Sequence, residues 1–380
     1  MTESAETTLR GITWNHTRGF APVVTASQVY CDTQEVDVTW ERRSLWHFGE
    51  GPLAELVQRY DLIVIDHPFA GTCANDRLVV PLDTVLPADV LAERAEHSVG
   101  PSFRSYTYAD RQWALPLDAA AQVAACREDL MAAACLSRPS TWDEALELAA
   151  ETGKVAVPLS PVNAACAFFS LCTGFGEEPF AMPQCIVPRV VAEQVLELLQ
   201  RLVAVIPPQC LSMNPIAVLN WASSTDDVIY VPLTFGYVNY SHAGYRPSRL
   251  TFHNPPGRDI GSTLGGAGIA ISAQSRHPYA AAELAAWLTS SECQRTSFAL
   301  SGGQPAHAAA WDDPLLDVVA DGFFRHTRAS LDGAYVRPTH DWFPGVQHRV
   351  AVTVSDFLRG SRGVRDTLDD LTARPIVATR

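Results

Sequence analysis

Short apolar runs alternate along this chain with segments of helical periodicity. Residues 11–14 and 36–40 favour strands, the second because its alternate residues are apolar. Apolar residues recur at helical spacing over 53–60, and the continuous apolar run 62–65 follows as a strand that ends at Asp66. Continuously apolar strands in strand–helix–strand order favour an α/β fold with a parallel sheet covered by helices.

A second α/β unit is predicted after the pattern changes near residues 137–150. The run Thr141-Trp142-Asp143-Glu144 has the spacing of a capping box and predicts the start of a helix. Segments 155–157, 195–202 and 228–231 then favour strand, helix and strand. Because 380 residues exceed the size at which a single core stops growing, we expect two domains.

The last third of the chain continues the alternation. A glycine-rich segment, 261–268, leads into the apolar run 269–271, and Pro278 is placed to open a helix. Residues 364–371 carry another helical stripe. No segment repeats at a fixed period, which argues against a solenoid.

Charge and hydropathy limit the partners. The chain carries 42 acidic and 28 basic residues, a formal net charge of −14, and such a surface repels nucleic-acid phosphates. No apolar segment is long enough for membrane insertion. The first residues lack the basic and apolar parts of an export signal. As the sequence stands we expect a cytoplasmic protein, or a periplasmic or extracellular one if an export segment has been removed.

Several kinds of site have no support in the sequence. The nine cysteines are odd in number and form no CxxC pair, which favours reduced thiols over a disulfide framework. The eleven histidines show neither HxH nor HExxH spacing, so no metal site is expected. No phosphate-binding glycine motif or GxSxG turn occurs. We therefore predict no cofactor.

Five segments together carry a family resemblance. They occur in the family's order and spacing, and the similarity covers residues 9–375. They are Tyr60-Asp61-Leu62-Ile63-Val64-Ile65-Asp66, Trp113-Ala114-Leu115-Pro116, Pro139-Ser140-Thr141-Trp142-Asp143-Glu144, Gly265-Gly266-Ala267-Gly268-Ile269-Ala270-Ile271 and Ser301-Gly302-Gly303-Gln304-Pro305. The chain resembles the family 1 extracellular solute-binding proteins, which are the sugar-binding receptors of bacterial ABC importers.

The resemblance implies a two-lobed fold of the periplasmic-binding-protein type, with discontinuous lobes and an interlobe cleft. Its hinge crossings fall near residues 115–125 and 258–268. Lobe 1 is then expected at 8–118 plus 262–312, and lobe 2 at 119–261 plus 313–376. The implied partners are a small-molecule ligand and, if the protein is exported, an ABC importer.

Polar side chains at strand ends are the first ligand candidates, because ligands of open α/β sheets sit beyond the carboxyl ends of strands. Trp14, Asn15 and His16 follow the first predicted strand, and Asp66 and His67 follow the run 62–65. Trp14 either covers an apolar ligand face or plugs the lobe edge. Asp66 either accepts ligand hydroxyl protons or caps the following turn.

Further candidates flank the predicted crossings and the second-lobe strands. Trp113 and Asp118 flank the first crossing, where Trp113 is alternatively hinge packing. Asn163 either bonds a hydroxyl or caps a helix. The loop residues Tyr237, Asn239 and Tyr240 combine rings and amides in a mixture typical of a recognition surface.

The late candidates come from the glycine-rich segment and the C-terminal loops. Gly265 and Gly266 either let the backbone approach a ligand or form a tight hinge turn. Gln304 lies in a turn that the resemblance singles out. Residues His340 and Trp342 lie in a late loop from which the family often brings an aromatic ring to the cleft, with a solvated loop as the alternative.

Two functions remain open at this stage. In the first, the lobes close around a small polar organic solute, sugar-like or a small acid, and a few polar contacts would be enough for about micromolar affinity. In the second, a cytoplasmic enzyme uses acid–base pairs in the same cleft. Asp66 with His67, and His340 with Asp341, are the catalytic candidates for the second function.

Overall fold

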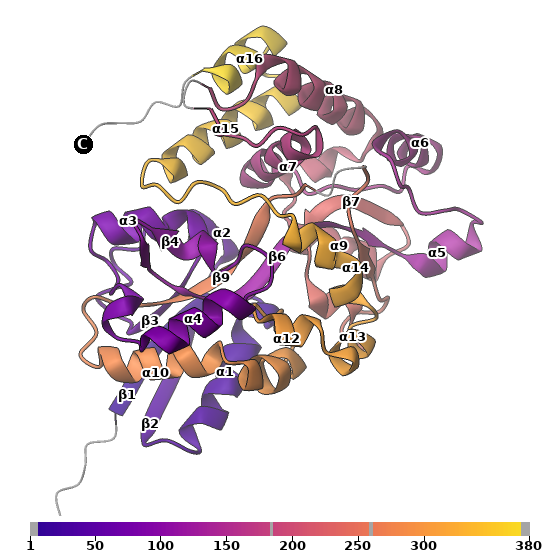
Figure 1. The fold of residues 1–380 in the computed structure, drawn as a ribbon. Helices are drawn as coiled ribbons and strands as arrows, with labels where there is room; N and C mark the ends of the chain where they lie inside the picture. Colours follow the sequence, from indigo (N-terminus) through magenta and orange to yellow (C-terminus); the bar gives the residue numbers. More distant parts are fainter. Residues whose placement is uncertain (1–6, 183–184, 258–260, 374–380) are drawn as a thin grey trace, which may run out of the picture. The chain divides into compact units, whose positions relative to one another are not determined.

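The structure is a computed structural model that describes residues 7–182, 185–257 and 261–373 (Figure 1). These residues divide into two compact units. The first comprises the chain up to Ala120, with Gly265–Val318 and Arg337–Asp341. The second comprises Ala121–Leu264, Val319–Val336 and the chain from Trp342 onward.

These units differ in detail from the lobes expected from the sequence. The expected ranges placed residues 119–120, 313–318 and 337–341 in the second lobe, whereas the structure places these segments in the first unit. Residues 262–264 were expected in the first lobe and lie in the second unit. Residues 183–184, 258–260 and 374–376, which the expected lobes included, lie outside the described residues.

The first unit is built around a mixed sheet. Strand β1 (Thr7–Trp14) pairs in parallel with β2 (Val36–Arg43) and with β3 (Leu62–Ile65). Strand β9 (Leu264–Ile271) pairs antiparallel with β3, and β6 (Leu115–Cys126) follows β9 in the strand order. The expectation of a parallel sheet is therefore wrong beyond β3. The chain enters β9 directly from the second unit, without the crossover helix that parallel strands require.

The apolar run of β3 is buried on both faces of this sheet. Leu62 and Val64 join one core with helices α1 (Thr17–Cys31) and α10 (Pro278–Leu288). Ile63 and Ile65 point to the opposite core. Burial on both faces explains why β3 is apolar throughout instead of alternating.

The helix expected over residues 53–60 is not formed. This segment is a series of turns, although Leu53, Val57 and Tyr60 are buried in the same core as Ile63. The apolar residues of this segment have helical spacing because they are the side chains that face the core. Successive turns also bring residues three and four apart to the same side.

The remaining elements of the first unit lie around this sheet. Short 3₁₀ turns separate several of them, and a π-helical turn occupies Gln294–Phe298. The others are α2 (Leu45–Gly49), α3 (Ala70–Asn75), α4 (Ala88–His97), β4 (Thr107–Tyr108), β5 (Arg111–Gln112), α11 (Ser291–Cys293), α12 (Ala308–Trp311) and α13 (Pro314–Val319).

The second unit takes its sheet from the far half of β6. That half pairs antiparallel with β7 (Tyr230–Phe235) and with β8 (Thr251–His253). Helix α7 (Pro161–Gly174) packs against α15 (Phe343–Leu358) and α8 (Arg189–Val205), and α16 (Val364–Thr372) packs against α8 and α15 (Figure 1). The other helices are α5 (Glu128–Ala133), α9 (Pro215–Ser224) and α14 (Phe323–Asp332).

The capping box predicted from the sequence is confirmed at helix α6 (Trp142–Thr152). The Thr141 hydroxyl accepts a hydrogen bond from the Glu144 backbone N–H at 3.2 Å, and the Glu144 carboxylate accepts one from the Thr141 N–H at 3.3 Å. The strand expected at 155–157 is reduced to one bridge between Val155 and Tyr230.

All nine cysteines are free, as the sequence predicted. Over the described residues, no helix combines the length and the hydropathy that a bilayer crossing requires.

Gly266 holds strands β9 and β6 close together. Its backbone lies in the left-handed region, with a φ of 103°, and a Cβ added there would overlap the carbonyl oxygen of Asp118. The glycine-rich segment thus serves close backbone packing at this position.

We expect Gly266→Ala to lower the free energy of unfolding by roughly 2–4 kcal/mol, because the substitution adds left-handed strain to a backbone overlap. Chemical denaturation measures the loss. Gly345→Ala is the matched control, since a Cβ at Gly345 in α15 meets no atom within 4 Å. Equal stability of the two variants would contradict this account of Gly266.

Candidate functional site

Two buried ion pairs lie in the first unit near the ends of its central strands. The side chain of Arg337 donates to both carboxylate oxygens of Asp66 at 3.0 Å, and both side chains are almost fully buried. Arg18, in the first turn of α1, makes a two-pronged ion pair with Asp118 on β6, whose Nε–Oδ2 distance is 2.8 Å. The two carboxylates are therefore neutralised locally.

Asp66 ends β3 and also caps the short turn that follows. Its carboxylate accepts a hydrogen bond from the backbone N–H of His67 at 2.9 Å. Burial alone raises the pKa of Asp66, but Arg337 and His67 outweigh burial and lower the pKa to about 2. Asp66 is thus a carboxylate at neutral pH, and it fills the capping role that was one of its two predicted roles.

His67 is fully buried behind Asp66. Its Nδ1 lies 3.3 Å from the Asp66 carboxylate, yet neither ring nitrogen makes a hydrogen bond within the described part of the chain. Burial, reinforced by the positive charge of Arg337, lowers the pKa of His67 to about 4. The ring is therefore neutral at physiological pH.

Tyr106 connects these groups. Its ring meets the His67 ring edge-on at 6.3 Å, and its hydroxyl donates to the Ile65 carbonyl at 3.4 Å. Burial raises the pKa of Tyr106, and the charges of Asp66 and Asp118 raise it further. We call the six residues Arg18, Asp66, His67, Tyr106, Asp118 and Arg337 the strand-end cluster.

Arg337 reaches the cluster on a short segment that returns to the first unit. The backbone N–H of Gly71 donates to the Thr339 carbonyl at 2.7 Å, and the Asn75 amide donates to the Asp341 carboxylate at 2.8 Å. His340 lies edge-on to Tyr108 at 5.5 Å. These contacts dock residues 337–341 on α3 and β4.

The other candidates of the first unit have packing or capping contacts. Trp14 packs on Phe48 at 5.1 Å within the core, and the His16 ring accepts from the Arg18 N–H as the cap of α1. Asn15 is exposed. Trp113 is buried and donates its indole N–H to the Tyr108 carbonyl at 2.9 Å.

Gln304 and the glycine pair lie beside β6. The Gln304 amide donates to the Ala119 carbonyl at 2.7 Å, next to Asp118 in the sequence. Gly265 and Gly266 begin the part of β9 that belongs to the first unit. Ligand contact by these residues stays a prediction.

In the second unit, the candidates form an aromatic loop and two flanking positions. Tyr240 lies edge-on to Tyr237 at 6.3 Å and to Tyr245 at 5.2 Å, and its hydroxyl donates to Asn220 at 2.9 Å. Asn239 is buried in the same loop.

The flanking positions are Asn163 and Trp342. The Asn163 amide donates to the Ser160 hydroxyl at the start of α7, at 2.7 Å. Trp342 packs against Phe180 and Phe343, with ring centroids 6.1 Å away in each case. Asn163 is the third residue of α7, whose N-cap residue Ser160 makes no side-chain capping bond, so the predicted capping role is not seen and ligand contact by Asn163 stays a prediction.

Sequence reasoning missed Arg18, Tyr106 and Arg337. The two arginines are single cations in otherwise unremarkable segments, and their partners lie 100 and 271 residues away. Across the described residues, no group of three or more His, Cys, Asp or Glu side chains is placed to hold a metal ion.

The fold defined by these units is that of the two-lobed solute-binding proteins. Maltose-bound MalE3 of T. maritima superposes with a TM-score of 0.81 at 17% identity, covering 96% of this chain and 98% of that one. A ribitol complex of an ABC transporter solute-binding protein from Agrobacterium radiobacter K84 gives 0.79 at 19% identity, covering 96% and 97%. The acarbose-binding GacH receptor of Streptomyces glaucescens gives 0.79 at 14% identity, covering 97% of each chain.

The family model for bacterial extracellular solute-binding proteins matches residues 54–318, more than half of the chain. The chain belongs to this family, as the sequence resemblance indicated. A search of curated proteins found no match.

We expect Asp66→Asn to lower the free energy of unfolding at pH 7 by about 3–5 kcal/mol, because it leaves the buried Arg337 charge without its carboxylate. The control is Glu193→Gln, which breaks an exposed pair with Arg189 and changes stability by less than about 1 kcal/mol. Urea denaturation of both variants tests the difference. A small, equal effect would show that the Asp66 pair is not energetically coupled to folding.

His67 gives the protein a specific pH dependence. Because its native pKa is lowered from 6.5 to about 4, the unfolded state binds a proton between these values and the native state does not. The contribution of His67 to the free energy of unfolding is fully present above pH 6.5 and falls by about 3 kcal/mol as the pH drops to 4. Asp66 acts at lower pH than His67, because the stability that its ionised carboxylate contributes is lost only as the pH falls from about 3.8 towards 2.

We therefore expect His67→Phe to remove about 3 kcal/mol of the stability loss between pH 6.5 and 4. Urea denaturation of both proteins across this range isolates the effect, because the other buried histidines contribute equally to each. Identical pH profiles would rule out a buried neutral His67.

Proposed function

We propose that this protein binds a neutral polyhydroxylated solute, a sugar or polyol, between its two units, and that the units close on it about the hinge segments. The observation that carries the proposal is the charge balance of the strand-end cluster. Arg18 and Arg337 are each matched by one carboxylate, so the cluster offers hydrogen-bonding groups without net charge. A charged solute would lack a counter-charge there.

Solved relatives with the same fold support this ligand class. The ligands of four such proteins are maltose, ribitol, tagatose and mannitol, all neutral and rich in hydroxyl groups. Of the three predicted rings, that of Trp342 is partly exposed and suited to cover the C–H face of such a molecule, whereas Tyr237 and Tyr240 are buried. The proposal takes the Trp342 ring, with Asn163 and Asn239, as the second unit's contribution.

The alternative of an enzyme is less well supported. A general base works best when its pKa is near the operating pH, whereas Asp66 lies near 2 and His67 near 4. Asp341 is held by Asn75. These groups are better suited to binding a solute through fixed hydrogen bonds than to transferring a proton.

Membership of an extracellular family also bears on the site of action. We propose that the protein works outside the cytoplasm and delivers its solute to an ABC importer. This is the second of the two locations expected from the sequence.

The test is a thermal-shift and calorimetric panel of maltose, ribitol, D-tagatose and D-mannitol, with D-glucuronate as the charged comparison. We expect at least one neutral compound to raise the melting temperature as its concentration increases. At a hundredfold excess over its Kd, the bound compound adds about 2.7 kcal/mol to the free energy of unfolding. D-Glucuronate should give no shift.

Small-angle scattering with the bound compound should show a smaller radius of gyration if the units close. A shift by D-glucuronate alone would overturn the neutral-ligand proposal, and so would the absence of any shift across a broad set of neutral sugars and polyols.

A further inference from the structure

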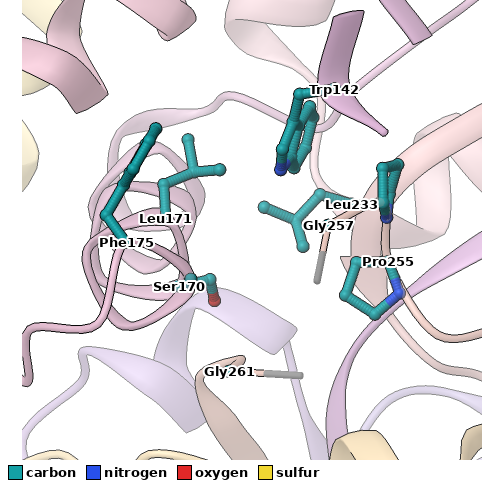
Figure 2. Close-up of a pocket in the computed structure, with 10 residues that line it drawn as sticks. Trp142, Ser170, Leu171, Phe175, Leu233, Pro255, Gly257 and Gly261 are labelled. Carbon is teal, nitrogen blue, oxygen red and sulfur yellow. The ribbon is translucent and has the colours of Figure 1, made fainter. Parts of the chain in front are cut away.

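The second unit contains a cavity that involves none of the predicted ligand-binding residues. It has a volume of about 190 Å³ and lies between the start of α6, the last turns of α7, and β7 (Figure 2). Its lining includes Trp142, Leu171, Phe175 and Leu233.

Most of the wall of this cavity is apolar. Leu171 and Phe175 lie four residues apart at the end of α7, and Trp142 and Leu233 lie opposite them (Figure 2). An apolar cavity of about 150 Å³ in another protein accommodates one benzene molecule. The present volume therefore suits a single aromatic ring with one or two additional heavy atoms.

One polar group faces this space and makes no hydrogen bond to the described part of the chain. The indole nitrogen of Trp142 is turned towards the middle of the cavity (Figure 2), and its N–H has no partner in the described part of the chain. The Ser170 hydroxyl is already engaged, since it bonds Gln122 and accepts from the Thr263 N–H at 2.7 Å. The described side chains that line the cavity therefore offer the Trp142 indole N–H and the Ser170 hydroxyl, and none of them carries a charge.

From this combination we infer that the second unit has a separate binding site for a small neutral aromatic molecule carrying one hydrogen-bond acceptor. The ring fills the apolar walls, and the acceptor takes the Trp142 N–H. A sugar fits this lining less well, because most of its hydroxyl groups would face apolar side chains. The site does not depend on the proposed solute function.

The probes are anisole and ethylbenzene, which have the same shape and differ in one ether oxygen. Nitrogen–proton spectra of the nine tryptophan indoles follow binding, and Trp142→Phe identifies the relevant signal by its loss. We expect anisole to shift that signal saturably and to bind about fivefold more tightly than ethylbenzene, because it gains one net hydrogen bond. In Trp142→Phe the two affinities should become equal.

A cavity-filling variant keeps the test independent of Trp142. Gly174 lines the cavity at the end of α7, and a Cβ there meets no atom within 4 Å. Gly174→Leu should therefore fold normally and lower the affinity for both probes at least tenfold. Gly345→Leu is the control, because that glycine is equally unobstructed in α15, away from the cavity lining, and binding should be unchanged.

Absence of saturable binding to the unmodified protein would overturn the inference, and so would unchanged binding by Gly174→Leu. The sugar and polyol panel is run on the same samples. Failure of that panel with retained anisole binding would refute only the solute proposal, and the reverse pattern would refute only this one.

Discussion

The ion pair between Asp66 and Arg337 is the constraint on which the first unit depends. Both side chains are almost fully buried, and each would be a costly isolated charge without the other. The pair therefore requires residues 337–341 to return to the first unit after the chain has already left it. Gly71 makes that return sterically feasible, because a Cβ there would overlap the Thr339 carbonyl.

The same ion pair determines which residues of the strand-end cluster are charged. Asp66 stays ionised because Arg337 lies beside it, and His67 stays neutral because burial and Arg337 both oppose its protonation. At neutral pH neither group changes charge, so the cluster keeps one set of donors and acceptors. Such constancy favours recognition of a solute, which needs pre-organised hydrogen bonds, over proton transfer.

The sequence predicted the parts of the fold that local periodicity determines. Strand β3 and helix α6 were recognisable because their burial and capping patterns lie within a few neighbouring residues. The direction of β9 and the return of residues 337–341 were not predicted, since both depend on partners more than 200 residues away. Turns over 53–60 imitated a helix because core-facing residues recur at similar spacing in both.

The site was predictable to a similar extent. The rule that ligands lie beyond strand ends selected Asp66 and His67, which the structure places in the strand-end cluster. The rule could not supply Arg18 or Arg337, because a lone arginine carries no sign of its distant carboxylate.

The tryptophans show why residue type alone does not assign a binding role. Trp14 and Trp113 were candidates because rings suit polar ligands, yet Trp14 packs on Phe48 and the Trp113 N–H is bonded to a carbonyl. Trp142 was read as part of a capping box and of a family motif, and its N–H faces a cavity without a partner in the described part of the chain. What distinguishes the three is whether the polar edge of the ring is already satisfied, and only the folded chain determines that.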